Sequence, residues 1–126
     1  MTLEKPEARV ISREELVDKR RRGDPFILVD VLSHEHFEHI HLPGAINVPL
    51  PMMRELAPLL FGKDDDIIVY CAGFECTASP TAATILTQLG FTRVAHYAGG
   101  IKDWQEGNLP LVHAPRAPAQ PGEQAA

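Results

Sequence analysis

The sequence predicts an α/β protein with a central, mainly parallel sheet flanked by helices on both sides. The first observation is that short apolar, β-type runs alternate along the chain with helix-type segments, the order expected when helices connect parallel strands. The second is that residues 26–31, Phe-Ile-Leu-Val-Asp-Val, are apolar at every position but one, which is typical of a strand buried on both faces. We expect this strand at the centre of the sheet.

Local signals mark where the predicted elements begin and end. Ser12 followed by Glu15 forms a capping-box pattern at the start of the first helix, because each side chain can bond the other residue's backbone N–H. Pro51 suits the first position of a later helix, and Gly90 suits the position after another one. In chain order, the expected elements are a strand at 8–11, a helix at 12–22, a strand at 26–31, a helix at 33–39, a strand at 45–48, a helix from 50, a strand at 66–70, a helix at 80–89, a strand at 93–97 and a last helix from 99.

Composition and charge narrow the class of protein. The chain has 126 residues, of which 44% are hydrophobic and 23% are charged, enough for one domain with its own core. No apolar run approaches the roughly 20 residues of a membrane span, and the acidic start lacks a signal-peptide pattern, so we expect a cytoplasmic protein without a membrane partner. The net charge of -5 argues against a nucleic-acid partner.

Three segments are expected along the chain: a lead-in at residues 1–7, one domain at 8–112 and a tail at 113–126. The tail is rich in proline and alanine and contains no large apolar residue. Such a segment cannot offset the conformational entropy that ordering removes. We therefore expect the tail to be disordered.

Cys71 is the residue that points most directly to chemistry. It follows the predicted strand at 66–70, and a loop at 72–78 leads from it to the next predicted helix. The start of a helix presents backbone N–H groups without intrahelical partners, so a strand end, a tight loop and a helix start together form an anion cradle. Because such a cradle lowers the pKa of a thiol, we expect Cys71 to be a nucleophile.

The second cysteine, Cys76, lies in the same loop and gives a C-x4-C spacing. Two cysteines are too few for a disulfide framework, and no second pair completes a zinc site. We therefore expect neither a metal nor a cofactor. Cys76 is either a resolving thiol for Cys71 or a small loop residue without a chemical role.

Four segments carry a resemblance to a known family. In chain order they are residues 28–31 (Leu-Val-Asp-Val), 37–49 (Phe-Glu-His-Ile-His-Leu-Pro-Gly-Ala-Ile-Asn-Val-Pro), 69–71 (Val-Tyr-Cys) and 99–104 (Gly-Gly-Ile-Lys-Asp-Trp). Together they resemble a single-domain rhodanese, of the subgroup with a longer C-x4-C active-site loop. The resemblance covers residues 8–112 and implies a rhodanese-like fold.

The resemblance also implies an activity and a site. It implies a sulfurtransferase in which Cys71 takes sulfane sulfur from thiosulfate, a polysulfide or a persulfide, and passes it to a thiol or another nucleophilic acceptor. A protein persulfide is a further possible partner. The loop residues implied to surround the transferred sulfur, mainly through backbone N–H groups, are Ala72, Gly73, Phe74, Glu75, Thr77 and Ala78.

One departure from the family pattern bears on the donor. Members active on thiosulfate commonly carry an arginine shortly after the cysteine, whereas residues 72–79 contain no Arg or Lys and place Glu75 there. A carboxylate repels dianions, so we expect the donor preference to move away from small dianions. The same absence argues against a phosphatase or an arsenate reductase. A thiol-disulfide redox module using Cys71 and Cys76, and a noncatalytic sulfide-sensing or partner-binding domain, stay open as alternatives.

Overall fold

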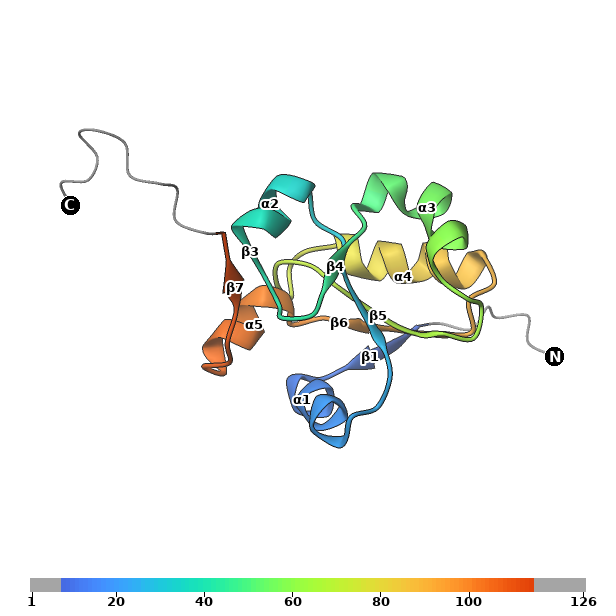
Figure 1. Ribbon diagram of the computed structural model, residues 1–126. Coiled ribbons are helices and arrows are strands. Elements are labelled where there is room, and N and C mark those ends of the chain that lie inside the picture. Colours follow the sequence, from blue (N-terminus) through green and yellow to red (C-terminus); the bar gives the residue numbers. More distant parts are fainter. Residues whose placement is uncertain (1–7, 115–126) are drawn as a thin grey trace, which may run out of the picture.

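A five-stranded sheet runs through the centre of the computed structural model, which describes residues 8–114 (Figure 1). The strand order is β1-β6-β5-β2-β4, and every pairing in this sheet is parallel. In chain order, the elements are β1 (Arg9–Ile11), α1 (Arg13–Arg22), β2 (Ile27–Asp30), α2 (His34–His39), β3 (Ile40–His41), β4 (Ile46–Asn47), the 3-10 helix η1 (Leu50–Met52), α3 (Met53–Leu60), β5 (Asp66–Tyr70), α4 (Ala78–Gln88), β6 (Arg93–Tyr97), α5 (Gly100–Glu106) and β7 (Val112–His113).

Helices cover both faces of the sheet, as the alternating pattern predicted. In Figure 1, α3 and α4 lie on one side of the strands and α1 and α5 on the other. The side chains between them form two apolar clusters, one containing Met53 and Leu86 and the other containing Leu16 and Trp104. Because the central strands β2 and β5 contribute to both clusters, they are buried on both faces, as their continuous apolar runs indicated.

The central pairing aligns the ends of three strands. Asp30 in β2 pairs with Tyr70 in β5, and Tyr70 pairs with Tyr97 in β6. Since all three strands are parallel, their carboxyl ends meet at one edge of the sheet, where α/β proteins bind ligands. Cys71 follows Tyr70 directly, so the fold places the candidate nucleophile at that edge.

The predicted element boundaries hold within a few residues. Two helices nevertheless differ from the prediction. The helix predicted from 50 is split into η1 and α3, and α4 begins at Ala78 rather than at about 80. The early start is compatible with Pro80, because a proline in the first helical turn removes an N–H that has no intrahelical partner. The capping box is present: Ser12 Oγ accepts a hydrogen bond from the Glu15 N–H, and Glu15 accepts one from the Ser12 N–H.

A second, two-stranded sheet was not predicted. In it β3 and β7 pair antiparallel, with Ile40 opposite His113 and His41 opposite Val112. The Ala114 N–H extends this contact with a 3.0 Å bond to the His39 carbonyl. His113, the first residue of the predicted tail, therefore lies in a strand. Residues 115–126 of that segment and the predicted lead-in at 1–7 lie outside the described residues.

Candidate active site

Cys71 sits in a closed position beneath its loop. Only 1% of its surface is exposed, and the same holds for Ser79 in the first turn of α4. The Cys71 Sγ donates a 3.4 Å hydrogen bond to the Ser79 Oγ. The strand end and the helix start therefore meet at this thiol, as the sequence predicted.

Helix α5 fixes the backbone of Cys71 from the other side. The Ile101 N–H donates a 3.1 Å bond to the Cys71 carbonyl, and the Lys102 N–H donates a 2.9 Å bond to the Ala72 carbonyl. This close approach depends on Gly100, which has a φ of 58°, and a Cβ added there would lie 2.2 Å from the Cys71 oxygen. The Gly-Gly segment that carries part of the family resemblance thus positions the cysteine loop.

The loop from Cys71 to α4 turns tightly and exposes its tip. The Cys76 N–H bonds the Gly73 carbonyl at 3.0 Å, and Phe74 at the tip has 70% of its surface exposed. Glu75 is exposed as well. Thr77 occupies the N-cap of α4 without a side-chain capping bond, so its hydroxyl has no capping role in this arrangement.

Burial, rather than the N–H groups of the loop and helix start, determines the direction of the Cys71 pKa shift. Burial raises the pKa of the Cys71 thiol, and its contact with the Cys76 thiol raises that pKa further, against the opposing bonds from Ser79. The expectation that the cradle lowers the pKa of Cys71 is therefore wrong. The cause is desolvation, which disfavours the thiolate at a site that water does not reach.

Cys76 receives the hydrogen bonds that were expected for Cys71. Although partial burial raises its pKa, the interaction with the Cys71 thiol and the backbone N–H groups of Ala72 and Ala78 outweigh that effect, and the pKa of Cys76 is lowered. Both cysteines are free thiols. The loop therefore places the two thiols close enough to affect each other's ionisation, and of the two the half-buried Cys76 has the lowered pKa.

A pocket of about 390 Å³ opens beside this loop. Cys76 lines the pocket and Cys71 does not, so a molecule in the pocket meets Cys76. The full lining consists of Ala72, Gly73, Phe74, Glu75, Cys76, Lys102 and Glu106. Most of the predicted loop residues thus share one pocket, whereas Thr77 and Ala78 are outside its lining.

Sequence reasoning missed Lys102 and Glu106. Both belong to α5, far along the chain from Cys71, and backbone hydrogen bonds join α5 to the cysteine loop. A signal was available in the segment at 99–104, which carries Lys102 two residues after the Gly-Gly pair. The site therefore has a cation, although residues 72–79 supply none.

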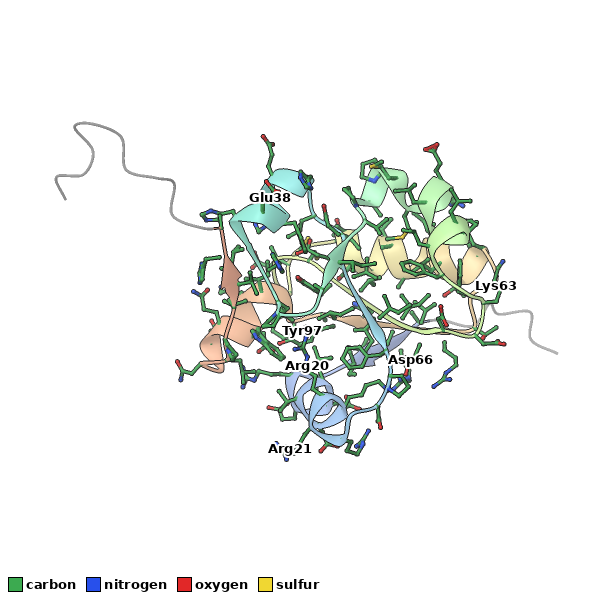
Figure 2. All side chains as sticks on the ribbon, in the orientation of Figure 1. Arg20, Arg21, Glu38, Lys63, Asp66 and Tyr97 are labelled. Carbon is green, nitrogen blue, oxygen red and sulfur yellow. The ribbon has the colours of Figure 1, made fainter. Side chains whose placement is uncertain are left out.

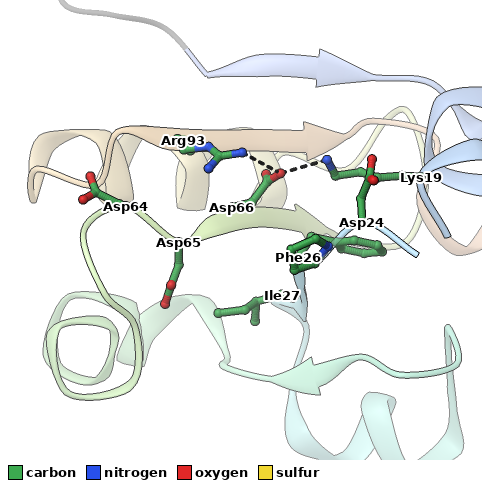
Figure 3. A pocket seen from close by; sticks show the side chains of 9 residues that line it. Lys19, Asp24, Phe26, Ile27, Asp64, Asp65, Asp66 and Arg93 are labelled. Atoms are coloured by element: carbon green, nitrogen blue, oxygen red, sulfur yellow. Dashed lines mark hydrogen bonds and ion pairs between the residues drawn. The ribbon is translucent and has the colours of Figure 1, made fainter. Parts of the chain in front are cut away.

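The opposite edge of the sheet holds a second pocket, of about 570 Å³. Figure 2 shows Asp66, at the start of β5, and Tyr97, at the end of β6, toward opposite edges. Asp66 is the charged centre of this second pocket, where Lys19 approaches its Oδ2 at 2.8 Å and Arg93 at 3.4 Å (Figure 3). Lys19 and Arg93 both pair with Asp66, and the pocket lining contains no thiol. We therefore interpret these residues as a structural ion-pair network.

Residues 8–114 were also compared with the requirements of a metal site and of a membrane-spanning helix. No group of three or more His, Cys, Asp or Glu side chains there is arranged to hold a metal ion. Among the helices of the same residues, none has the length and apolar character needed to cross a membrane.

A parallel sheet with a buried cysteine at a strand end, closed by a Gly-Gly helix start, defines a rhodanese-like domain. The family model described as "Rhodanese-like domain" matches residues 12–107. The chain therefore belongs to the rhodanese-like family.

Two curated relatives show how the chain compares with named proteins. It is 37% identical over 101 residues to the HTH-type transcriptional regulator Rv0324 of Mycobacterium tuberculosis, a match that covers 80% of this chain and 43% of the regulator. It is 40% identical over 77 residues to the thiosulfate sulfurtransferase PspE of Escherichia coli, covering 60% of this chain and 70% of PspE. The chain thus spans less than half the length of the regulator and most of the length of PspE.

Solved structures agree with this assignment. The BH2092 protein from Bacillus halodurans superposes with a TM-score of 0.78 at 30% identity, covering 85% of this chain and 78% of that one. A rhodanese with anions from E. coli has a TM-score of 0.57 at 35% identity, covering 69% and 96% of the two chains. The rhodanese-like fold predicted from the sequence is confirmed.

Proposed function

We propose that this chain is a sulfurtransferase that carries sulfane sulfur as a persulfide on Cys71. The observation that carries the proposal is the pair of free thiols in one loop at the carboxyl edge of the sheet, with Cys71 against Ser79 and Cys76 facing a pocket. Membership of the rhodanese-like family and the sulfurtransferase named among the relatives support it.

Loading begins with a proton transfer between the two cysteines. Because the pKa of Cys76 is lowered and that of the neighbouring Cys71 is raised, the Cys76 thiolate can take the Cys71 proton. The Cys71 thiolate then attacks the outer sulfur of a donor R–S–SH, the donor's S–S bond breaks, and RS⁻ leaves. The same attack on thiosulfate would release sulfite. Since Cys71 is almost fully buried, the loop at 72–77 must shift for this step.

Two routes can empty the persulfide. An external thiolate can attack the outer sulfur and leave as a new persulfide, which regenerates the Cys71 thiolate. Alternatively, the Cys76 thiolate can attack the inner sulfur, which forms a Cys71–Cys76 disulfide and releases hydrosulfide. The second route needs a thiol reductant to restore both cysteines.

The presence of two interacting free thiols in one loop also favours a second candidate, a thiol-disulfide redox module. In that function the Cys71–Cys76 disulfide would be the working oxidised state, and sulfane sulfur would play no part. The two functions differ in one observable, because only the sulfurtransferase needs Cys71 to bear an additional sulfur atom.

Sulfur transfer by three proteins separates the candidates. We would measure transfer from polysulfide to a small thiol for the wild type, Cys71→Ser and Cys76→Ser. The proposal expects no transfer by Cys71→Ser. It expects continued but slower transfer by Cys76→Ser, because solvent must then take the Cys71 proton, with hydrosulfide release also slowed if Cys76 resolves the persulfide. Turnover by Cys71→Ser would overturn the role of Cys71. Absence of transfer by the wild type, together with reversible disulfide formation, would favour the redox module.

A further inference from the structure

The geometry points to a zwitterionic sulfur compound as the occupant of the pocket beside the cysteine loop. Such a compound carries an ammonium and a carboxylate together, as cysteine and its persulfide do. Lys102 would pair with the carboxylate, and Glu75 and Glu106 with the ammonium. The inference rests on the proposed function only in making this occupant a donor or acceptor of sulfur.

The backbone fixes the position of Lys102 at the pocket. Its N–H is bonded to the Ala72 carbonyl at 2.9 Å, and a Cβ built on Gly73 would lie 3.4 Å from the Lys102 Cβ. The stem of the lysine therefore packs on the loop that follows Cys71. Lys102, which belongs to α5, therefore lies beside the cysteine loop.

The charges that line the pocket have no partners among residues 8–114. Lys102, Glu75 and Glu106 take part in none of the ion pairs found there, which instead join residues such as Lys19 to Asp66 and Arg13 to Asp103. One cation and two carboxylates give the lining a formal charge of -1. A ligand with one charge of each sign can pair with both kinds of side chain, whereas a small dianion meets net repulsion.

The size and the remaining lining fit a small aminothiol. A volume of about 390 Å³ lies at the lower end of the range for small-molecule pockets. The exposed ring of Phe74 offers an apolar surface for a methylene stem. Cys76 supplies a sulfur atom to the lining of the pocket. A thiol or persulfide whose ammonium and carboxylate pair with the charged side chains of the lining would therefore lie beside Cys71 and Cys76.

Thiol–disulfide exchange at Cys76 tests the charge preference without needing a persulfide. In Cys71→Ser, the Cys76 thiolate attacks a symmetrical disulfide RSSR, a mixed disulfide forms and RS⁻ leaves. The four probes are cystine with both charges, cystamine with ammonium only, 3,3′-dithiodipropionate with carboxylate only, and 2-hydroxyethyl disulfide with neither. Rates of mixed-disulfide formation, measured by mass spectrometry, are divided by those of a short peptide with one cysteine.

The inference expects cystine to react fastest after this correction, by about fivefold over the uncharged probe, the scale of exposed ion pairs. Lys102→Met should slow both probes that carry a carboxylate and should not slow cystamine. Glu75→Gln combined with Glu106→Gln should slow both ammonium probes. Lys63→Met serves as the matched control, because Lys63 lies toward the opposite edge of the sheet with Asp66 (Figure 2).

Equal corrected rates for the four probes would overturn the inference, as would a loss of cystine preference in Lys63→Met equal to that in Lys102→Met. Neither result would touch the proposed function, which depends on persulfide formation at Cys71. Conversely, failure of Cys71 to bear sulfur would overturn the proposed function and leave the measured charge preference standing.

Discussion

The thiols of Cys71 and Cys76 affect each other's ionisation within one loop, and their pKa values move in opposite directions. The buried Cys71 becomes less acidic, while Cys76, which gains the loop N–H groups, becomes more acidic. In the proposed reaction, Cys76 is therefore the proton acceptor and Cys71 is the residue that bears sulfur.

This pairing predicts the order in which the cysteines react with iodoacetamide. Alkylation requires the thiolate, and a lowered pKa means that the thiolate forms at lower pH. Cys76 should therefore be modified before Cys71, and its rate should rise with pH around a midpoint below the ordinary cysteine value of about 8.5. Peptide mapping across a pH series measures both rates. Faster modification of Cys71 would contradict the assignment.

The approach of α5 to the cysteine loop predicts the cost of Gly100→Ala. A non-glycine residue at its positive φ costs about 1–2 kcal/mol, and the 2.2 Å contact with the Cys71 oxygen adds strain. We expect a total loss of about 3 kcal/mol or more in the free energy of unfolding.

Gly23→Ala is the matched control for this substitution. Gly23 also has a positive φ, of 76°, but an added Cβ there meets no atom within 4 Å. Its loss should be confined to the conformational cost of about 1 kcal/mol. Urea unfolding of the three proteins measures the difference, and equal losses for the two variants would show that the close approach to Cys71 carries no strain.

Glu75→Arg is expected to raise activity with thiosulfate. The change replaces a carboxylate in the pocket lining by a cation and changes the local charge by two units. With solvent and salt screening, about 1 kcal/mol of added attraction is expected, equivalent to about a fivefold to tenfold gain in kcat/KM. Transfer from an uncharged donor should change little.

Salt and a remote variant check the electrostatic origin of that gain. It should shrink as ionic strength rises, because screening weakens exposed charge interactions. Glu55→Arg, at an exposed position in the first turn of α3, makes the same change in net charge away from the pocket lining. A similar gain in Glu55→Arg would mean that net charge, not position 75, controls thiosulfate use.

The sequence was sufficient for most of the sheet and for the place of Cys71. Continuous apolar runs identify β2 and β5 because burial on both faces leaves no polar positions, and the capping box locates α1. The pairing of β3 with β7 escaped prediction because two-residue strands with exposed or half-buried side chains carry no periodic signal.

Side-chain chemistry at the site was harder to predict than the fold. The direction of the Cys71 pKa depends on burial beneath its own loop, and local motifs do not report burial. The role assigned to Lys102 depends on a tertiary contact between α5 and the cysteine loop, so a search of residues 72–79 alone could not find it. Both prediction errors concern residues whose surroundings depend on tertiary packing rather than on the local sequence.

Mass analysis of Cys76→Ser after treatment with polysulfide shows whether Cys71 can carry sulfur as a persulfide. The chain has two cysteines, so this variant retains Cys71 alone, within the tryptic peptide at 64–93. Without a resolving thiol, we expect this peptide to gain one sulfur atom, more slowly than in the wild type because Cys76 no longer takes the Cys71 proton. A thiol acceptor should then remove that sulfur. A folded variant whose Cys71 peptide stays unmodified at saturating polysulfide would contradict the account.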